Sequence, residues 1–477
     1  MTTIEGLIAT HDKKPFRGRI TIDTKTGLIT QVSKPKKKLA DHIFGNDCLI
    51  FPGFGDVHIH AREDETGKQN YKEEYATAGN AALHGGVVHI SAMPNTLSPV
   101  VDKKQFAWHR ARIATIDHPV SILNYVGIDT KTKPLGRPGE HFYKLYFGKS
   151  IGDLTVTYGS ELEKILSRYK GHHISFHVEY EPIVQASTKG KTHSDRRPVE
   201  CVNEGLRMLL PLVEKYKIHA KLCHWSTGGE SFEMIRAFRA CGCDITLEVS
   251  PLHLLFDTSM TDADPSLWLK IQMNPAIQSA EHRKALIDGL RSGFIQFIAT
   301  DHAPHTEDEK HAAFAKFSAD YPGKSNTEIA RRIREKDPQL FLATCTENNT
   351  SGAPWLDIYA LVCAWLMREH KFTPQMIARA AAYYPGSFVN PHLKKQLPGK
   401  KFGKGFGQIK KGFIGSLTVL NMKKKTLVRR KDLKTKCGWS PLEGRAMPGS
   451  VEAIFIRGVH RVGVRHIRQD MLSFEPF

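Results

Sequence analysis

The stretch Leu49–His60, LIFPGFGDVHIH, consists of an apolar run, a Pro-Gly turn and a second short run that carries His58 and His60. Alternate residues of a β-strand point to the same face, so these two imidazoles project side by side from one strand end. Two imidazoles placed in this way can hold a metal ion between them. The same spacing also occurs in ordinary polar strands, so the rest of the chain has to decide between the two interpretations.

Composition and length indicate a globular protein with a large core. The 477 residues, 40% of them hydrophobic and 9% aromatic, suggest two or three domains, or one large barrel with an appendage. No apolar run approaches the roughly 20 residues that span a bilayer, and the N-terminus lacks a secretory pattern. The eight cysteines are scattered without a CxxC pair. We therefore expect reduced thiols, a cytoplasmic location and no membrane partner.

The formal net charge of +19 is concentrated in short basic clusters. These clusters are Lys34 with Lys36–Lys38, Lys394–Lys395, Lys400–Lys401, Lys410–Lys411, Lys423–Lys425 and Arg429–Lys431. No aromatic residues are interleaved with them in the manner of a nucleic-acid-binding motif. We therefore interpret the clusters as a solvated surface that attracts anionic metabolites, in preference to a nucleic-acid site.

An alternation of β-like and helical patterns follows this stretch. The apolar runs cover residues 54–60, 87–95, 121–128, 142–148, 173–179, 220–226, 245–250 and 294–304. The helical patterns between them are Tyr71–Leu83, Gln105–Ile116, Gly159–Tyr169, Val199–Tyr216, Phe232–Cys241 and Glu281–Ser292. Eight strands with helical connections predict a closed (β/α)8 barrel. A doubly wound open sheet is the alternative, but no glycine-rich phosphate loop follows the first strand.

Both ends of the chain predict a small second domain rich in β-strands. Residues 1–52 contain short alternating runs, and further β-like runs occur at Gly415–Leu420, Lys425–Arg429 and Val451–Arg457. Later helical patterns occupy Glu328–Lys336, Trp355–Arg368 and Pro374–Tyr383, before a Gly- and Lys-rich loop at Leu397–Phe413. We therefore expect a barrel over residues 53–396 and a β-domain made jointly from residues 1–52 and 397–477.

Polar residues recur at the C-terminal ends of the apolar runs. They are His58, His60, Asn95, Lys144, His177, His224 and Asp301. In a barrel these strand ends converge on one mouth, which is where active sites are built. A lone histidine is commonly structural, but equivalent placement on six strands predicts a common site.

At this point the sequence resembles dihydroorotases, within the cyclic amidohydrolase group. The resemblance rests on PGFGDVHIHAR, on GG followed by SAMPNT, and on YKLYFG, FHVE, CHWST, LEVSPLH, ATDHAPH and CGWSPLEGRAMPGSV with the later FIRG. It extends from about residue 45 to about residue 460. The family fold is a (β/α)8 barrel with a small β-domain from both chain ends, as the patterns above predict independently.

The resemblance implies a zinc centre, with two ions in each subunit. His58 and His60 would bind the first zinc together with Asp301, and His177 and His224 would bind the second. Lys144 would carry a carboxyl group on its amine and bridge the two ions, since an ammonium cannot ligate a cation. A plain structural lysine is the alternative at this position. Some relatives have Asp at the bridging position or lack the second metal.

The resemblance also implies an anionic substrate, L-dihydroorotate, interconverted with N-carbamoyl-L-aspartate in pyrimidine (UMP) biosynthesis. Arg62, Asn95 and His305 would bind its carboxylate, and Asn274 would contact the ring. A cyclic amide is a poor electrophile, which a metal can polarise while it activates water. Asp301 would then take the proton of the attacking water and return it to the leaving nitrogen. Family members form homodimers or associate with aspartate transcarbamoylase.

Some positions depart from the family pattern. Asn274–Gln278 reads NPAIQ where NPP-x-R is common, Leu252-His253 stands where two histidines are usual, and Gly415–Leu417 replaces Asp-Ala-Asp. None of these touches the expected metal ligands. Three alternatives stay open. They are another ring opener of the hydantoinase or allantoinase type, a catalytically silent homologue that acts as a scaffold, and a basic nucleic-acid-associated protein.

Overall fold

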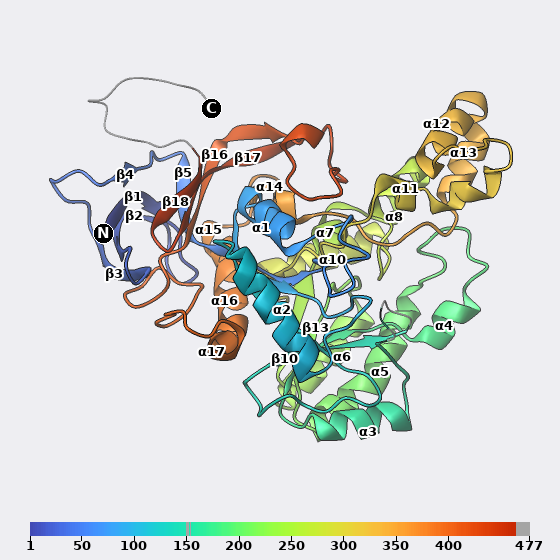
Figure 1. Ribbon diagram of the computed structural model, residues 1–477, viewed down its shortest axis with the longest axis horizontal. Coiled ribbons are helices and arrows are strands. Elements are labelled where there is room, and N and C mark those ends of the chain that lie inside the picture. Colours follow the sequence, from blue (N-terminus) through green and yellow to red (C-terminus); the bar gives the residue numbers. More distant parts are fainter. Residues whose placement is uncertain (149–151, 153, 464–477) are drawn as a thin grey trace.

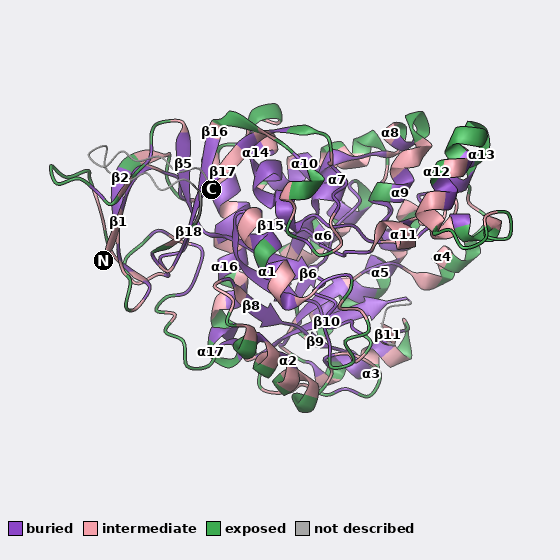
Figure 2. Cartoon of the chain, turned by 45° about the horizontal axis from the view of Figure 1, so that its top comes forward, coloured by how far each residue is buried: buried purple, intermediate pink, exposed green. Residues whose placement is uncertain are grey.

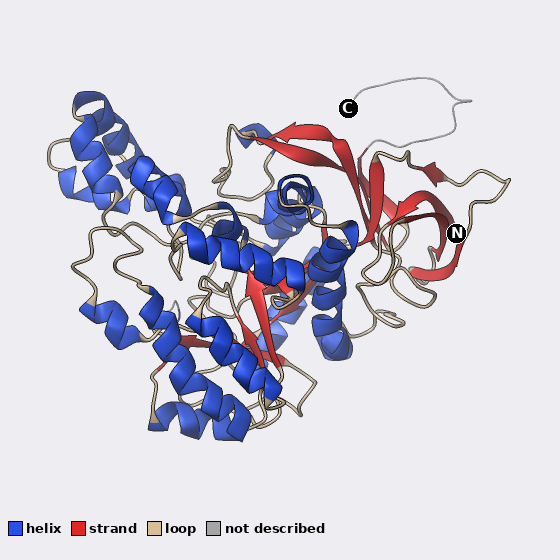
Figure 3. Cartoon of the chain, turned by 180° about the vertical axis from the view of Figure 1, so that it is seen from behind, coloured by secondary structure: helices blue, strands red, loops and turns tan. Residues whose placement is uncertain are grey.

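A computed structural model describes residues 1–148, 152 and 154–463 of the chain (Figure 1). A β-domain lies at one side of a helix-covered barrel, and a helical protrusion extends from the opposite side (Figures 1 and 3). The last residues of the expected C-terminal segment, 464–477, lie outside the described part. Within the described part, no helix combines the length and apolar character that crossing a membrane requires.

The barrel is built from parallel strands at equivalent positions around a closed ring. They are β6 (Phe54–Ile59), β7 (Val87–Ala92), β8 (Ser121–Asn124) with β9 (Val126–Gly127), β10 (Phe142–Phe147), β12 (His173–His177), β13 (His219–Leu222), β14 (Ile245–Val249) and β15 (Phe297–Ile298). Their hydrogen-bonded order is β6-β7-β8 and then β9-β10-β12-β13-β14-β15. The short strand β11 (Thr155–Val156) pairs with β10 beside the ring.

The ring closes between its first and last strands. Ile59 forms a parallel bridge with His302, and the His60 N–H donates to the His302 carbonyl oxygen at 2.7 Å. The Asp56 carboxylate accepts from the Thr300 N–H at 3.1 Å. The (β/α)8 prediction is therefore confirmed. Strands of such a ring are buried on both faces, which explains why the apolar runs are nearly continuous (Figure 2).

Helices connect the strands of the ring, and some of them extend beyond it. In chain order they are α1 (Tyr75–His84), α2 (Lys103–Ile116), α3 (Ser160–Arg168), α4 (Glu181–Ala186), α5 (Val199–Lys215), α6 (Glu230–Ala240), α7 (Pro251–Leu255), α8 (Thr258–Ala263), α9 (Trp268–Ile271) and α10 (Ala280–Ser292), followed by α11 (Glu307–Lys310), α12 (Asn326–Lys336), α13 (Pro338–Cys345), α14 (Tyr359–Glu369), α15 (Pro374–Ala378), α16 (Tyr384–Val389) and α17 (Leu393–Gln396). Helices α12 and α13 form the protrusion and share a separate small core that includes Phe314, Ile329 and Phe341.

The β-domain joins strands from both ends of the chain in one sheet. Its order is β18 (Val459–Gly463), β17 (Ala446–Ile456), β16 (Leu417–Leu427), β5 (Cys48–Pro52), β1 (Thr2–Ile8), β2 (Phe16–Asp23) and β3 (Leu28–Ser33), and β4 (His42–Ile43) pairs with β1. The two chain ends meet where β16 lies antiparallel to β5. Because β5 leads directly into β6, this sheet anchors the start of the strand that carries His58.

Three local predictions differ in detail from the structure. The runs at Gly415–Leu420 and Lys425–Arg429 belong to one strand, β16, interrupted by a bulge where the Asn421 side chain accepts from the Lys423 and Lys424 N–H groups. The helix expected from Trp355 begins instead with a 3₁₀ turn, Leu356–Ile358. The helix expected over Pro374–Tyr383 continues α15 through a π-helical turn, Arg379–Tyr383.

Close packing between β6 and β7 generates a stability prediction. Gly55 lies opposite His89, and a Cβ atom at Gly55 would come within 2.1 Å of the buried His89 ring. We expect Gly55→Ala to lower the free energy of unfolding by about 1–3 kcal/mol, measured by denaturant titration. In a His89→Ala background the same Gly55→Ala change should cost much less, because the ring that the new Cβ atom would meet is absent. Gly45→Ala is the control, since nothing lies within 4 Å of a Cβ atom there. Equal stability of Gly55→Ala and wild type would contradict this packing.

Candidate active site

The polar strand ends converge on one cavity at the C-terminal mouth of the barrel. The cavity has a volume of about 210 Å³. Its lining includes nine of the ten predicted site residues, which are His58, His60, Arg62, Asn95, His177, His224, Asn274, Asp301 and His305. The structure therefore brings together residues that are up to 247 positions apart, from His58 to His305. Lys144, the tenth, lies on β10, one of the strands that form this mouth.

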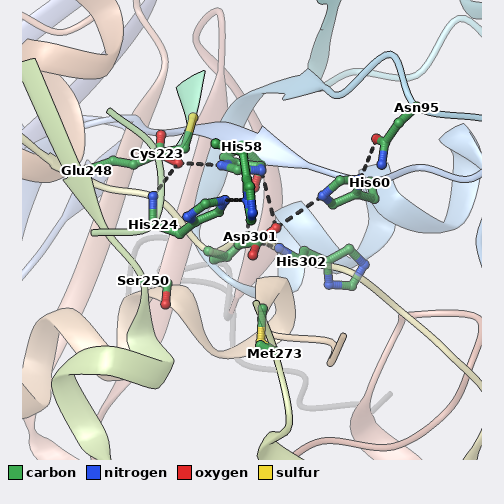
Figure 4. A network of polar contacts seen from close by, with 12 residues as sticks. His58, His60, Asn95, Cys223, His224, Glu248, Ser250, Met273, Asp301 and His302 are labelled. Atoms are coloured by element: carbon green, nitrogen blue, oxygen red, sulfur yellow. Dashed lines mark hydrogen bonds and ion pairs between the residues drawn. The ribbon is translucent and has the colours of Figure 1, made fainter. Parts of the chain in front are cut away.

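Two histidines and one carboxylate form a compact group that could hold a metal ion (Figure 4). The Nε2 atoms of His58 and His60 lie 3.2 and 3.1 Å from the same oxygen, Oδ1 of Asp301. One ligand atom from each of the three residues falls within 4.8 Å of the others, and all three residues are buried. Imidazole nitrogen with carboxylate oxygen is a donor set that suits zinc. The residues present therefore fit a metal ion.

Hydrogen bonds on the far side of each ring fix the orientation of these histidines. Glu248 accepts from Nδ1 of His58, and the Asn95 side-chain oxygen accepts from Nδ1 of His60 at 2.9 Å. With the proton held on Nδ1, each Nε2 presents a lone pair to the group. Burial lowers the pKa of His58 to about 4 and the pKa of His60 well below its ordinary value. Both rings are therefore neutral at neutral pH, as metal ligands must be.

A second pair of histidines lies beside the first group. Nδ1 of His177 is 2.9 Å from Nε2 of His224. Nε2 of His177 donates to Glu179 at 2.9 Å, and Arg197 holds that carboxylate at 2.6 Å. This bond leaves the lone pair of His177 on Nδ1, facing His224. Burial lowers the pKa of His224 well below its ordinary value. These two ring nitrogens lie at hydrogen-bond distance and point to the same place, so both could bind a second ion.

Lys144 is buried in β10 next to these histidines. Among the described residues its Nζ atom has no hydrogen-bond partner, and it lies 4.9 Å from the centre of the Tyr146 ring. Its charge contributes to the lowered pKa values of His60 and His224, after burial. A buried ammonium without a partner is costly. Within the described part of the chain, its amine is therefore not engaged in a hydrogen bond that would oppose the modification implied by the sequence resemblance.

Strained backbone accompanies the site. Arg62, His224 and Asp301 have φ angles of 60°, 36° and 49°, in the left-handed region that costs a non-glycine residue about 1–3 kcal/mol. Neighbouring hydrogen bonds hold them, such as the Trp225 N–H to the Glu248 carbonyl oxygen at 2.8 Å. Each turn comes directly at or after a strand end, where it redirects a functional side chain toward the mouth.

Cations and amides form the opposite side of the cavity. Nη2 of the buried Arg62 donates to Nε2 of His305 at 3.2 Å. The Asn274 side-chain oxygen accepts from Nε2 of His193 at 3.0 Å and from the Ser351 hydroxyl at 3.1 Å. The arrangement places a permanent positive charge and several hydrogen-bonding groups in a buried setting. An anionic group can be recognised there.

Sequence reasoning missed the supporting acids, Glu248 and Glu179. Glu248 holds Lys221 as well as His58, and it also accepts from the His224 N–H at 3.1 Å. A second group with closely spaced ligand atoms consists of His58, Cys223 and Glu248. The charge of its carboxylate is already balanced by the Lys221 ammonium. Charged residues inside apolar strand runs, as in AKLC and ITLEV, are the signal that could have found Lys221 and Glu248.

Comparisons with known proteins agree with this site. The model of the family described as dihydro-orotase-like matches residues 47–137. A curated dihydroorotase from Halalkalibacterium halodurans is 31% identical over 326 residues, covering 65% of this chain and 71% of that protein. One from Thermococcus kodakarensis is 27% identical and covers 93% of this chain and 90% of that protein. An L-hydantoinase structure from Arthrobacter aurescens has a TM-score of 0.76 over 98% of this chain and 97% of its own, at 17% identity, which supports the fold.

The Glu248–Lys221 pair generates a second prediction. The charge of Lys221, with His58, holds the pKa of Glu248 below its ordinary value although burial acts in the opposite direction. Glu248→Gln leaves the Lys221 ammonium buried without its counter-charge, so we expect a loss of about 3–5 kcal/mol in the free energy of unfolding. The double variant Lys221→Met/Glu248→Gln should recover most of that loss. Additive losses in a double-mutant cycle by denaturant titration would contradict the pairing.

Proposed function

The chain belongs to the dihydroorotase family, and from that premise we propose that it is an active zinc-dependent dihydroorotase. It would catalyse the reversible hydrolysis of the cyclic amide of L-dihydroorotate to N-carbamoyl-L-aspartate in pyrimidine biosynthesis. One observation carries this proposal. A group suited to a metal, His58 with His60 and Asp301, shares a small cavity with the Arg62–His305 pair, which is suited to a carboxylate.

We assign the metal ligands as follows. His58, His60 and Asp301 would hold one zinc ion, and His177 with His224 would hold a second. Carboxylated Lys144 would bridge the two ions. Bound zinc would supply Lewis acidity toward the ring carbonyl and toward water. The neutral, oriented imidazoles and the unpartnered Lys144 amine support this assignment.

Asp301 is the proposed proton carrier of the reaction. Burial raises the pKa of its carboxyl group above the ordinary value, although His58 and Lys144 act in the opposite direction. A carboxylate of raised basicity can take the proton of the attacking water and deliver it to the ring nitrogen as the amide opens. Ring closure reverses these steps. Asp301 contacts both histidines of the metal group and lines the cavity, which supports this role.

Arg62, Asn95 and His305 are the proposed carboxylate-binding residues, and Asn274 is the proposed ring contact. Arg62 cannot lose its charge and offers a fork of donors to a carboxylate. Since the Asn274 side-chain oxygen already accepts from His193 and Ser351, its amide nitrogen is the atom that we assign to the ring. A hydantoinase-like activity would not use a cation at this position. A silent scaffold would not need all six ligands.

The wider setting is proposed on the same premise. We propose a cytoplasmic enzyme with domains at residues 1–52, 53–396 and 397–477, in which the first and last segments form one β-domain. A homodimer, or an association with aspartate transcarbamoylase, is the proposed quaternary state. Sedimentation of the purified chain with and without that enzyme tests this assignment.

Ring opening of L-dihydroorotate by the zinc-loaded protein, followed by ultraviolet absorbance, tests the function. We expect turnover of L-dihydroorotate with a kcat/KM at least about a hundredfold above that for dihydrouracil. Dihydrouracil has no carboxylate, so it would leave Arg62 and His305 without an anion to bind. Allantoin should not react. Asp301→Asn should lower kcat by about a hundredfold or more. Faster opening of dihydrouracil would favour the hydantoinase-like alternative. No turnover of any ring by protein shown to hold zinc would favour the scaffold.

Lys144 generates a separate prediction. Wild-type protein loaded with zinc in ¹³C-bicarbonate should show a carbamate resonance in its ¹³C spectrum. In Lys144→Ala the zinc content should fall by about half, because the ligand proposed to join the two ions is missing. Lys215→Met is the control, because Lys215 is a surface lysine that pairs with Glu163 and takes no part in the site. It should keep the resonance. An active wild-type protein without a carbamate resonance would rule out the modification.

A further inference from the structure

An acid–base pair lies behind His305, on the ring edge opposite Arg62. Nδ1 of His305 is 3.3 Å from Oε2 of Glu309 and 3.3 Å from Nζ of Lys72. Lys72 and Glu309 are themselves joined at 2.8 Å. Glu309 belongs to α11 and Lys72 to the segment before α1. None of the functional assignments above uses this pair.

The donors around His305 determine where its proton lies. An arginine can only donate, so Nε2 of His305 must accept the bond from Arg62. A neutral His305 therefore carries its proton on Nδ1. A lysine also only donates, so the acceptor for that Nδ1–H is Glu309. In the free site Glu309 thus holds His305 in the tautomer whose lone pair faces Arg62 and the cavity.

Glu309 is fixed firmly enough to impose this tautomer. Its carboxylate accepts from the Tyr71 hydroxyl at 2.7 Å and from the Thr306 N–H at 3.0 Å, in addition to Lys72. Although burial acts in the opposite direction, bonds from His305, Lys72 and Tyr71 hold the pKa of Glu309 below its ordinary value. The acid is therefore ionised throughout the neutral range.

The charges that face His305 keep it neutral while the site is empty. They are Arg62 and Lys72, which are positive, Lys310, whose pKa burial lowers to about 7, and Glu309, which is negative. Burial, helped by the three cations, lowers the pKa of His305 to about 3 despite Glu309. A neutral ring in this tautomer turns a lone pair toward an incoming carboxylate. His305 can donate to that carboxylate only if Nε2 gains a proton. A shift of the Nδ1 proton to Nε2 would turn the Nδ1 lone pair toward the Glu309 carboxylate, so we expect the proton to come from solvent.

We propose that the Glu309–Lys72 pair sets the proton state of His305, so that binding of the anionic ring draws one proton from solvent onto Nε2. The resulting imidazolium lies between two carboxylates, Glu309 on Nδ1 and the ligand on Nε2, while Arg62 turns from His305 to the ligand. Glu309 and Lys72 are thus positioning residues for carboxylate recognition. This inference rests on the proposed function, because it assumes an anionic ring in the cavity.

Calorimetric titration with orotate tests the coupling, since orotate is a ring carboxylate whose aromatic ring resists opening. Titrations in buffers of different ionisation enthalpy give the number of protons taken up. We expect about one proton per orotate near neutral pH, with a Kd that rises about tenfold for each pH unit. Uracil, which lacks the carboxylate, should bind without proton uptake. Tight orotate binding without proton uptake would overturn the proposal.

Two variants separate this role from a merely structural one, because they change the charge on His305 in opposite directions. Glu309→Gln removes one carboxylate from the imidazolium, so proton uptake should fall below half and the Kd for orotate should rise about tenfold, equal to one pKa unit. Lys72→Met leaves Glu309 uncompensated, so proton uptake should persist to higher pH. The proposal would be contradicted if both variants bound orotate more weakly to the same degree and their proton uptake did not change in opposite directions.

Glu307→Gln is the matched control, since Glu307 lies on the same helix but pairs with Arg430 at 2.7 Å on the surface. It should behave as wild type. Turnover of dihydroorotate by the wild-type protein distinguishes a failure of this inference from a failure of the proposed function. Turnover without proton uptake overturns this inference alone. The absence of both turnover and orotate binding overturns the proposed function together with it.

Discussion

The carboxylate of Glu248 is the contact on which the metal side of the cavity depends. It lies on β14, bonds the ammonium of Lys221 on β13, accepts from the His58 ring on β6 and accepts from the His224 N–H. One buried acid thus joins three strands of the ring and also sets the tautomer of a proposed ligand. A buried charge of this kind is tolerated because its partners are equally buried and close to it. These contacts join β6, β13 and β14 at the mouth of the barrel.

The two sides of the cavity manage charge in opposite ways. On the metal side, burial keeps His58, His60 and His224 neutral, which leaves lone pairs that a cation can use. On the anion side, the same burial surrounds Arg62, whose guanidinium remains charged at any accessible pH. A site that opens a neutral amide in an anionic ring needs both properties a few ångströms apart. The left-handed turn at Arg62, two residues after His60, places both sides on one strand end.

Much of this arrangement could be predicted from the sequence, because two simple rules act together. Alternation along a strand pairs His58 with His60, and a closed parallel ring brings all strand ends to one mouth. The partners that orient those residues could not be predicted in the same way. Glu309 and Lys72 are 237 positions apart, and only the packing of α11 against the segment before α1 brings them together. Periodicity indicates which face a residue occupies but does not identify its neighbour across the fold.

Asn95 shows how the two sides are coupled. Its side-chain oxygen accepts from Nδ1 of His60, so the orientation of this amide is tied to a proposed metal ligand. An amide held by its oxygen presents its nitrogen as the end that can donate to an anion. A metal ion that fixes His60 therefore also fixes the donor for the carboxylate. One amide thus connects a proposed metal ligand with the proposed carboxylate site.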